Sequence, residues 1–251
     1  MKRRGRAAAV AVAVMGLSAV GCGSGHQPAE SEGGGPVTTQ TGRPPYSGLS
    51  EVPERLGNDG TTITVGDPAA PMTVRLYEDP RCPVCKEFET DGGAPRLRAA
   101  TVRRETKTEY TLASFLDDRL GGSGSKKAVN ALRAALDAGK FAEYHDVLYA
   151  GQPAESVDGF TDAYLLKLAA KVPGLRGHAF DSAVKTMKYR TFVENAEEAY
   201  EEADAPGTPT AEIDDVRIPN EYSGLLFSGS AFGKLLTEIR KDPGTWRSAA
   251  G

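Results

Sequence analysis

Two cysteines separated by two residues, Cys82 and Cys85, most constrain what this chain can fold into. They closely follow an apolar, strand-like run at residues 72–77, and residues 86–89 suit the start of a helix. A dithiol at a strand-to-helix junction is typical of thiol redox sites, because the unpaired N–H groups of a helix N-terminus favour a thiolate over a thiol. The sequence therefore predicts that Cys82 and Cys85 form a redox pair.

Charged residues surround this pair and act on it in opposite directions. Arg81 and Lys86 flank the cysteines and are expected to favour a Cys82 thiolate. Four nearby acids are expected to oppose it: Glu78, Asp79, Glu87 and Glu89. The residues between the cysteines, Pro83 and Val84, add no side-chain hydrogen-bond donor.

Two other interpretations of the motif are a structural disulfide and half of a zinc site. A bridge across two intervening residues closes a very small loop, so it constrains the unfolded chain little. A zinc site needs about four ligands, and the remaining candidates form no second closely spaced pair: Cys22, His26, His145 and His178. We therefore expect neither a metal nor another cofactor, and we interpret His145 and His178 as packing or surface histidines.

Residues 1–21 are interpreted as a signal peptide. Four basic residues precede an apolar stretch, residues 7–20, that is shorter than the roughly 20 residues of a membrane-spanning helix. The residues Ala19-Val-Gly-Cys22 resemble a bacterial lipobox, in which the cysteine is lipidated and becomes the first residue of the mature protein. The alternative is ordinary secretory cleavage, which would leave Cys22 as a spare thiol. With Cys22 as a lipid anchor, the three cysteines divide into one anchor and one redox pair.

The rest of the chain divides into a tether, one domain and a short tail. Residues 22–60 are rich in Gly, Ser, Pro and Thr and are predicted to be a flexible linker spanning on the order of 35 Å. Residues 61–241 suit one domain, and residues 242–251 form the tail. The net charge is −4 for the whole chain and −8 without residues 1–21, where 26 basic residues face 34 acidic ones. This excess of acids argues against nucleic acid or anionic lipid surfaces as partners.

Alternating patterns and turn residues predict the first and last parts of the domain. Strands are expected at residues 61–65, 73–77 and 108–115. A helix is expected from Cys82 to about Arg103, with an interruption near Gly92 and Gly93. The last elements are a hairpin, residues 211–218, that turns at Asp214 and Asp215, and a helix at residues 230–240.

Between these parts, from about residue 125 to residue 203, the apolar pattern has a helical period. Ser125 and Thr161 are expected to cap two of the helices, and Gly139 and Gly151 to end two. Apolar residues on shared helix faces are expected to point inward: Val129, Leu132, Leu136, Phe141, Tyr144, Leu148, Tyr164, Leu165 and Leu168.

Three features together resemble the DsbA-like thiol–disulfide oxidoreductases of the thioredoxin superfamily. They are residues 65–74 followed by the Cys82-Pro-Val-Cys85 motif, the helices inserted after the third strand, and Gly207-Thr-Pro-Thr210 before the hairpin. The resemblance covers about residues 61–241. It implies an α/β, thioredoxin-like fold with a helical insertion at about residues 125–203.

The resemblance also implies a second part of the site. Pro209 is expected to be a cis proline that faces the dithiol, since X–Pro bonds hold the cis form at low cost. Thr208 would then offer backbone groups to an extended substrate segment. The chain departs from the family at Leu76, where an acid is common, and at Val84, where the strongest oxidants carry histidine. Val84 therefore predicts a weaker oxidant.

The loss of the acid at Leu76 leaves open which group accepts the proton of Cys85, and the nearest acids are Glu78 and Asp79. The predicted function is disulfide exchange by an enzyme lipid-anchored on the extracytoplasmic face of the cell membrane, with secretion as the alternative location. Its expected reaction is oxidation of cysteines in exported proteins, with Cys82 forming the mixed disulfide and Cys85 resolving it.

The expected partners are exported proteins with thiols or disulfides, an unknown membrane redox partner, and the membrane through the lipid anchor. Nucleic acid is not expected as a partner. Two alternatives remain for the function: a reductase or isomerase of the same fold, and a non-enzymatic metal-carrier lipoprotein.

Overall fold

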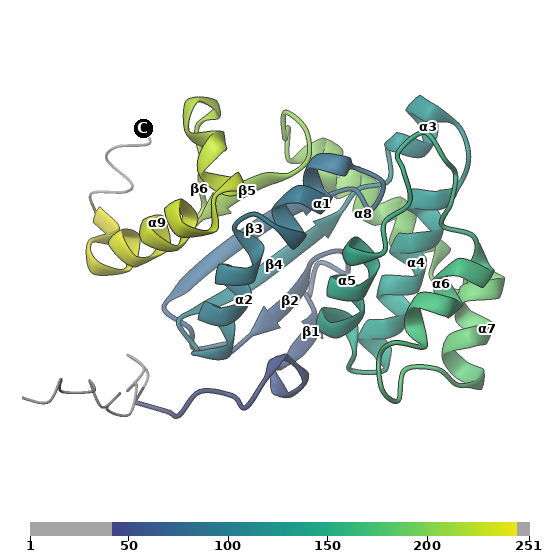
Figure 1. The fold of residues 1–251 in the computed structure, drawn as a ribbon, viewed down its shortest axis with the longest axis horizontal. Helices are drawn as coiled ribbons and strands as arrows, with labels where there is room; N and C mark the ends of the chain where they lie inside the picture. Colours follow the sequence, from purple (N-terminus) through teal and green to yellow (C-terminus); the bar gives the residue numbers. More distant parts are fainter. Residues whose placement is uncertain (1–41, 245–251) are drawn as a thin grey trace, which may run out of the picture. The chain divides into compact units, whose positions relative to one another are not determined.

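The computed structural model describes residues 42–244, and the predicted signal peptide, Cys22 and most of the predicted linker lie outside these residues. The strands form one six-stranded sheet in the order β1-β2-β4-β3-β5-β6 (Figure 1). Their bounds are Glu54–Leu56 (β1), Ile63–Gly66 (β2), Met72–Glu78 (β3), Thr106–Leu112 (β4), Thr210–Ile213 (β5) and Val216–Arg217 (β6). β3 and β4 are parallel, and the other neighbours are antiparallel. The fold is α/β and thioredoxin-like, as predicted.

Helices pack against the sheet, and several of them gather beyond one end of it. Their bounds are Pro83–Thr90 (α1), Ala94–Val102 (α2), Leu116–Leu120 (α3), Gly124–Asp137 (α4), Phe141–Ala150 (α5), Asp162–Ala169 (α6), His178–Thr186 (α7), Arg190–Glu202 (α8) and Gly229–Lys241 (α9), with short 3-10 helices at Leu49–Glu51 and Asn220–Phe227. The helices from α4 to α8 lie between β4 and β5 in the chain, which confirms the predicted insertion. In Figure 1, α4, α6 and α7 gather at the opposite end of the sheet from α9. Within residues 42–244, no helix is both long and apolar enough to cross a membrane.

Successive side chains of the central strand β3 lie on opposite faces of the sheet, apolar on one face and charged on the other. Val74 and Leu76 of β3 are fully buried in the main apolar core. Between them, Arg75 points to the other face and pairs with Glu109 of β4 at 3.0 Å and Glu212 of β5 at 3.2 Å. This alternation follows from the two-residue period of a strand, and it fixes the register of three neighbouring strands.

The folded domain begins earlier than the sequence predicted. Residues 42–60, expected to be the end of a flexible linker, include β1, in which Glu54 pairs with Val65 of β2. The Glu54 carboxylate also accepts hydrogen bonds from the N–H groups of Phe141 and Ala142, at 2.9 and 2.7 Å. It therefore caps α5 from 87 residues away in the chain, a role that the composition of residues 22–60 does not reveal.

Most of the expected turn and cap residues lie where the sequence placed them. The Thr161 hydroxyl caps α6 by accepting from Tyr164 N at 3.2 Å, and Asp214 and Asp215 form the hairpin turn with positive φ angles. The expected cap at Ser125 is wrong. Ser125 lies inside α4, whose N-terminal N–H groups are instead bound by the Asp117 carboxylate.

Candidate active site

The dithiol lies at the N-terminus of α1, directly after the loop that follows β3. Cys82 is the N-cap residue of the helix, and Pro83 takes the first helical position, which needs no N–H donor. The N–H of Cys85 donates to Cys82 Sγ at 3.4 Å. Cys82 is 6% exposed and Cys85 is completely buried, and the two are not bonded to each other. The first cysteine is thus the one that another molecule can reach.

This setting lowers the pKa of Cys82 from its ordinary value of 9.0 to about 6. The largest cause is the hydrogen bond from the Cys85 thiol, and burial acts in the opposite direction. A contact with Thr208 and the backbone N–H groups of Val84 and Cys85 lower the pKa further. Cys82 is therefore largely a thiolate at neutral pH, which is the state needed for attack and the better leaving group.

The loop before β5 faces this sulfur. The Thr208–Pro209 peptide bond is cis, as the family resemblance implied. Cys82 Sγ lies 3.2 Å from the carbonyl oxygen of Thr208, to which the thiol form donates. β5 holds the loop in place because it pairs antiparallel to β3, with Tyr77 opposite Thr210. The structure thus brings together the four motif residues and the loop that sequence reasoning assigned to the site.

The side chains of the two flanking cations, Arg81 and Lys86, make hydrogen bonds to distant segments. Arg81 is 3% exposed, and its guanidinium pairs with Asp117 at 2.8 Å and donates to the carbonyl oxygens of Gly121 and Glu155. Lys86 Nζ donates to the carbonyl oxygen of Gln152 at 3.4 Å. Their hydrogen bonds hold the surrounding loops, and the expectation that these two charges stabilise the thiolate stays a prediction.

Two polar side chains fix the backbone around Cys82: Gln152, which the sequence did not single out, and Asp79, which was expected only as an acid near the thiols. Gln152 donates from Nε2 to the carbonyl oxygens of Pro80 and Cys82, both at 2.8 Å. Asp79 accepts from the N–H groups of Arg81 and Leu116 and from the Ser125 hydroxyl. Burial raises the pKa of Asp79 to about 7. No local sequence signal reveals these contacts, because most of them join segments far apart in the chain.

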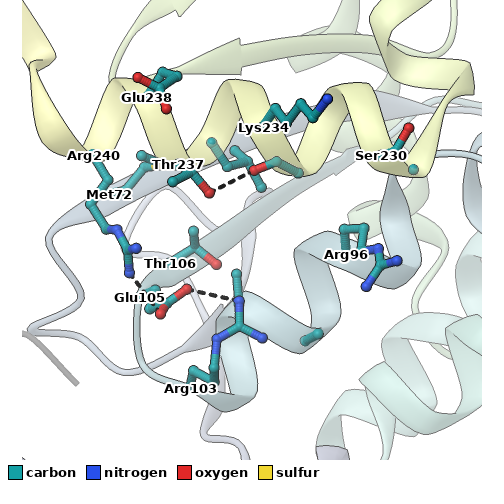
Figure 2. Close-up of a pocket in the computed structure, with 15 residues that line it drawn as sticks. Met72, Arg96, Arg103, Glu105, Thr106, Ser230, Lys234, Thr237, Glu238 and Arg240 are labelled. Atoms are coloured by element: carbon teal, nitrogen blue, oxygen red, sulfur yellow. Dashed lines mark hydrogen bonds and ion pairs between the residues drawn. The ribbon is translucent and has the colours of Figure 1, made fainter. Parts of the chain in front are cut away.

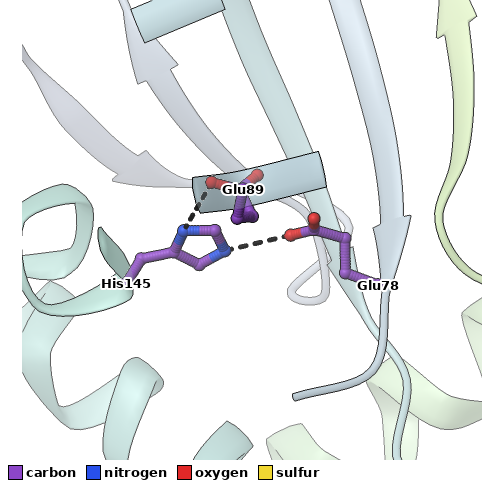
Figure 3. Close-up of side chains that lie close together, drawn as sticks. All are labelled: Glu78, Glu89 and His145. Carbon is purple, nitrogen blue, oxygen red and sulfur yellow. Dashed lines mark hydrogen bonds and ion pairs between the residues drawn. The ribbon is translucent and has the colours of Figure 1, made fainter. Parts of the chain in front are cut away.

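Beneath the dithiol lies a buried acid–histidine cluster made of Glu78, Glu89 and His145 (Figure 3). The three come from the end of β3, from α1 and from α5. His145 Nε2 is 3.0 Å from Glu78 Oε2, and Nδ1 is 3.8 Å from Glu89 Oε2, so the ring lies between the carboxyls. His145 is buried, as one of the expected alternatives stated, but its polar partners were not foreseen.

Burial changes the charges of this cluster. It raises the pKa of the Glu78 and Glu89 carboxyls and lowers that of the His145 imidazole. The neighbouring Glu78 charge also raises the pKa of Glu89. With pKa values of about 8, Glu78 and Glu89 are mostly protonated at neutral pH, so they oppose the thiolate less than two charged carboxylates would.

Cys85 lies against the same cluster. Burial raises the pKa of its thiol well above the ordinary range, and the neighbouring Glu78 charge acts in the same direction. Tyr149 packs against both cysteines and stacks edge-on with His145, with ring centres 4.9 Å apart. The resolving cysteine is thus held as a neutral thiol until its proton is removed.

The three side chains of the acid–histidine cluster are of types that can bind a metal ion. Its donor atoms lie within 4.8 Å of one another, and carboxylates with imidazole are suitable zinc ligands. However, Glu78 and Glu89 face opposite nitrogens of the single His145 ring, and one imidazole nitrogen binds one ion. This geometry suits a hydrogen-bonded chain better than ligands that converge on one metal.

A separate pocket of about 380 Å³ lies between α2 and α9 (Figure 2). Arg103 and Arg240 both pair with Glu105 along its wall, at 2.9 and 2.6 Å. Neither cysteine and no residue of the Thr208 loop lines it. The pocket therefore takes no part in the dithiol site.

A dithiol at a helix N-terminus, opposite a cis-proline loop on a mixed sheet, defines a thioredoxin-fold protein. The family model described as Thioredoxin matches residues 58–226. The chain belongs to the thioredoxin family.

Known proteins are similar in sequence to part of this chain. The serine/threonine-protein kinase PknE of Mycobacterium tuberculosis (strain H37Rv) is 30% identical over 169 residues, which are 62% of this chain and 28% of the kinase. Disulfide bond formation protein D of Bacillus subtilis is 24% identical over 158 residues, which are 62% of this chain and 69% of that protein. The chain thus spans 28% of the length of the kinase.

A solved structure supports the fold. The crystal structure of oxidised BdbD from Bacillus subtilis aligns with a TM-score of 0.61 at 20% identity, over 78% of this chain and 98% of that one. At this level of identity the likeness concerns the fold alone.

Proposed function

We propose that this protein is a protein-disulfide oxidoreductase that oxidises cysteines of exported proteins through Cys82 and Cys85. The observation that carries the proposal is the contrast between the two thiols. Cys82 is partly accessible with a pKa of about 6, whereas Cys85 is buried with a raised pKa. A nucleophile and a resolving thiol with these properties are what disulfide exchange requires. The name of the B. subtilis relative, disulfide bond formation protein D, is consistent with this activity.

The oxidising reaction proceeds in two exchanges. A substrate thiolate attacks Cys82 Sγ of the Cys82–Cys85 disulfide, forms a mixed disulfide, and releases the Cys85 thiolate, which takes up a proton. A second substrate thiolate then attacks the substrate sulfur of the mixed disulfide and releases the Cys82 thiolate. Two substrate thiols become one disulfide, while the protein disulfide becomes a dithiol.

The surrounding groups support each exchange. The backbone of Thr208 lies beside Cys82 and can pair with an extended substrate segment. The Glu78 carboxyl lies close enough to raise the pKa of the Cys85 thiol, and we assign it as the nearest proton donor and acceptor for that sulfur. This assignment answers the question that the sequence left open at Leu76.

The low pKa of Cys82 favours the oxidising direction. Stabilising its thiolate stabilises the dithiol form and raises the reduction potential, by about 30 mV for each 1.4 kcal/mol. We expect a potential between those of thioredoxin and DsbA, about −270 and −120 mV, and nearer the second. Equilibration of the protein with glutathione measures it. A potential below that of thioredoxin, with brisk reduction of insulin, would favour the reductase alternative instead.

Trapping variants test the roles of the two thiols. Cys85→Ser is expected to accumulate mixed disulfides with exported proteins, because the resolving thiol is missing, whereas Cys82→Ser accumulates none. Non-reducing gels followed by mass spectrometry would identify the trapped proteins. If Cys85 instead formed the adducts, the assignment would be reversed.

We also propose a location on the extracytoplasmic face of the cell membrane, through a lipid on Cys22. The support is the lipobox-like sequence at residues 19–22, together with a redox dithiol that suits an oxidising compartment. Cys22→Ala is expected to move the protein from the membrane fraction to the soluble fraction, or to stall its processing. A wild-type protein that was wholly soluble, with an unmodified Cys22, would contradict this location.

A further inference from the structure

We propose that His145 and the two carboxyls beside it form a relay that carries the proton gained and lost by Cys85. The inference rests on the proposed function and adds a residue of the helical insertion to the machinery of the thioredoxin-like sheet. His145 touches neither sulfur, so its role is that of a residue acting through Glu78.

Each catalytic cycle has to move one proton at a buried sulfur. Cys85 is completely buried at the N-terminal end of α1, and a thiolate there is costly because it lacks solvation. The Glu78 carboxyl can exchange that proton but is itself 0% exposed. A carboxyl without access to solvent can transfer one proton. Other groups must then return it to its original protonation state before the next transfer.

The cluster offers a route for this restoration through one hydrogen bond and one longer contact. Glu78 Oε2 contacts one nitrogen of the His145 ring at 3.0 Å, and Glu89 Oε2 lies 3.8 Å from the other nitrogen. Glu89 is 1% exposed and is the member of the cluster next to a surface ion pair, because Arg98 binds it at 2.6 Å and pairs with the 51% exposed Asp146 side chain at 3.0 Å. Figure 3 shows the imidazole between the two carboxyls.

The other polar groups around the ring do not compete for its nitrogens. Tyr110 of β4 and Tyr149 of α5 pack against the imidazole in tilted and edge-on orientations, with ring centres 4.8 and 4.9 Å away. Burial raises the pKa of both phenols far above neutrality, so they stay protonated. Arg98 from α2 supplies a fixed positive charge that binds Glu89 rather than the ring. The imidazole nitrogens therefore face only the two carboxyls among the described residues.

Each proton transfer in the relay joins two neighbouring groups. When the Cys82–Cys85 bond breaks, the Cys85 thiolate takes the proton of the Glu78 carboxyl. Glu78 then takes a proton from Nε2 of the imidazole, and Nδ1 receives one from Glu89. Glu89 regains its proton from a water molecule that enters beside the Arg98–Asp146 pair, because the Arg98 guanidinium itself stays protonated. When Cys85 attacks a mixed disulfide, each proton moves in the reverse direction.

The test uses the full chain carrying Cys22→Ala, so that only the two active thiols react with the aromatic disulfide DTNB. Attack by Cys82 releases the first thionitrobenzoate, and attack by Cys85 on the resulting mixed disulfide releases the second. We expect His145→Gln to slow the second release at least about tenfold at pH 7 and to change its pH profile, since general acid–base transfer contributes roughly 10²–10⁴-fold to rates. The first release should stay within about twofold of wild type. Glu89→Gln is expected to act in the same way.

Tyr144→Phe is the matched control, because it removes another buried hydrogen bond of α5, to the carbonyl oxygen of Leu165, without touching the cluster. It should leave both releases unchanged. The relay is refuted if His145→Gln and Glu89→Gln leave the second release and its pH profile as in wild type, or if they slow both releases equally. Loss of the second release on treatment with EDTA would assign the cluster to a metal and also overturn the relay. Absence of both releases in the unmodified dithiol would instead refute the proposed function.

Discussion

The hydrogen bond from the Cys85 thiol is the largest influence on Cys82, and removing it gives a prediction with a definite size. A hydrogen bond to a charged group contributes about 1.5–3 kcal/mol, and 1.36 kcal/mol corresponds to one pH unit, so Cys85→Ala should raise the pKa of Cys82 by about one to two pH units. Its titration would then have its midpoint at about pH 7 to 8 rather than about 6.

The assay is the thiolate absorbance near 240 nm, followed against pH in reduced protein that carries Cys22→Ala. Cys85→Ser is the matched control, because its hydroxyl can still donate to the thiolate, and its midpoint should stay closer to that of wild type. The rate of alkylation by iodoacetamide should follow the same midpoints. A midpoint near 6 in Cys85→Ala would refute the reasoning and would assign the low pKa to the backbone N–H groups of α1.

The same shift predicts how stability depends on pH. The folded-state pKa of Cys82 is lower than the unfolded value, so its contribution is fully present above about pH 9 and is lost as the pH falls through about 6. The full contribution is about 4 kcal/mol for a shift of this size. The reduced protein should therefore gain stability relative to Cys82→Ser between pH 6 and pH 9 in urea unfolding. Because the acid–histidine cluster is present in both proteins, the comparison cancels most of its own titration. A constant difference in unfolding free energy across this range would contradict the low pKa.

Two further predictions concern stability alone and are measured by urea unfolding of the reduced protein. Arg81→Met should cost about 3–5 kcal/mol because it leaves the buried Asp117 carboxylate without its cation. The double variant with Asp117→Asn should recover part of that loss, because it removes the charge and keeps an oxygen that accepts from the N–H groups of α4. A cost below about 1 kcal/mol would mean that the pair is not buried in solution. Gly93→Ala should cost about 1–3 kcal/mol because its new methyl group would lie 2.6 Å from the Phe232 ring, whereas Gly207→Ala, with no atom within 4 Å, should cost less; equal costs for the two variants would refute the packing argument.

Local sequence signals predicted much of the fold. The alternation of β3 and β4, the hydroxyl cap at Thr161 and the turn at Asp214 and Asp215 were all foreseen, because each depends on residues within a few positions of one another. The position of the dithiol at the start of α1 was likewise predicted from neighbouring residues. The helix N-terminus on which it lies contributes backbone N–H groups that lower the pKa of Cys82.

The tertiary structure decided which distant groups meet. Glu78 and His145 are separated by 67 residues, and no periodic pattern indicates that a histidine of the insertion would lie under the dithiol. Long-range capping is similar, because Glu54 and Asp117 bind helix N-termini to which they are not adjacent in sequence. The direction of the Arg81 side chain was also fixed by a distant acid rather than by its neighbour Cys82. The periodicity of the sequence shows which face of an element is buried. The partner of a buried charge depends instead on how the elements pack, because a buried charge is costly unless a complementary group lies next to it.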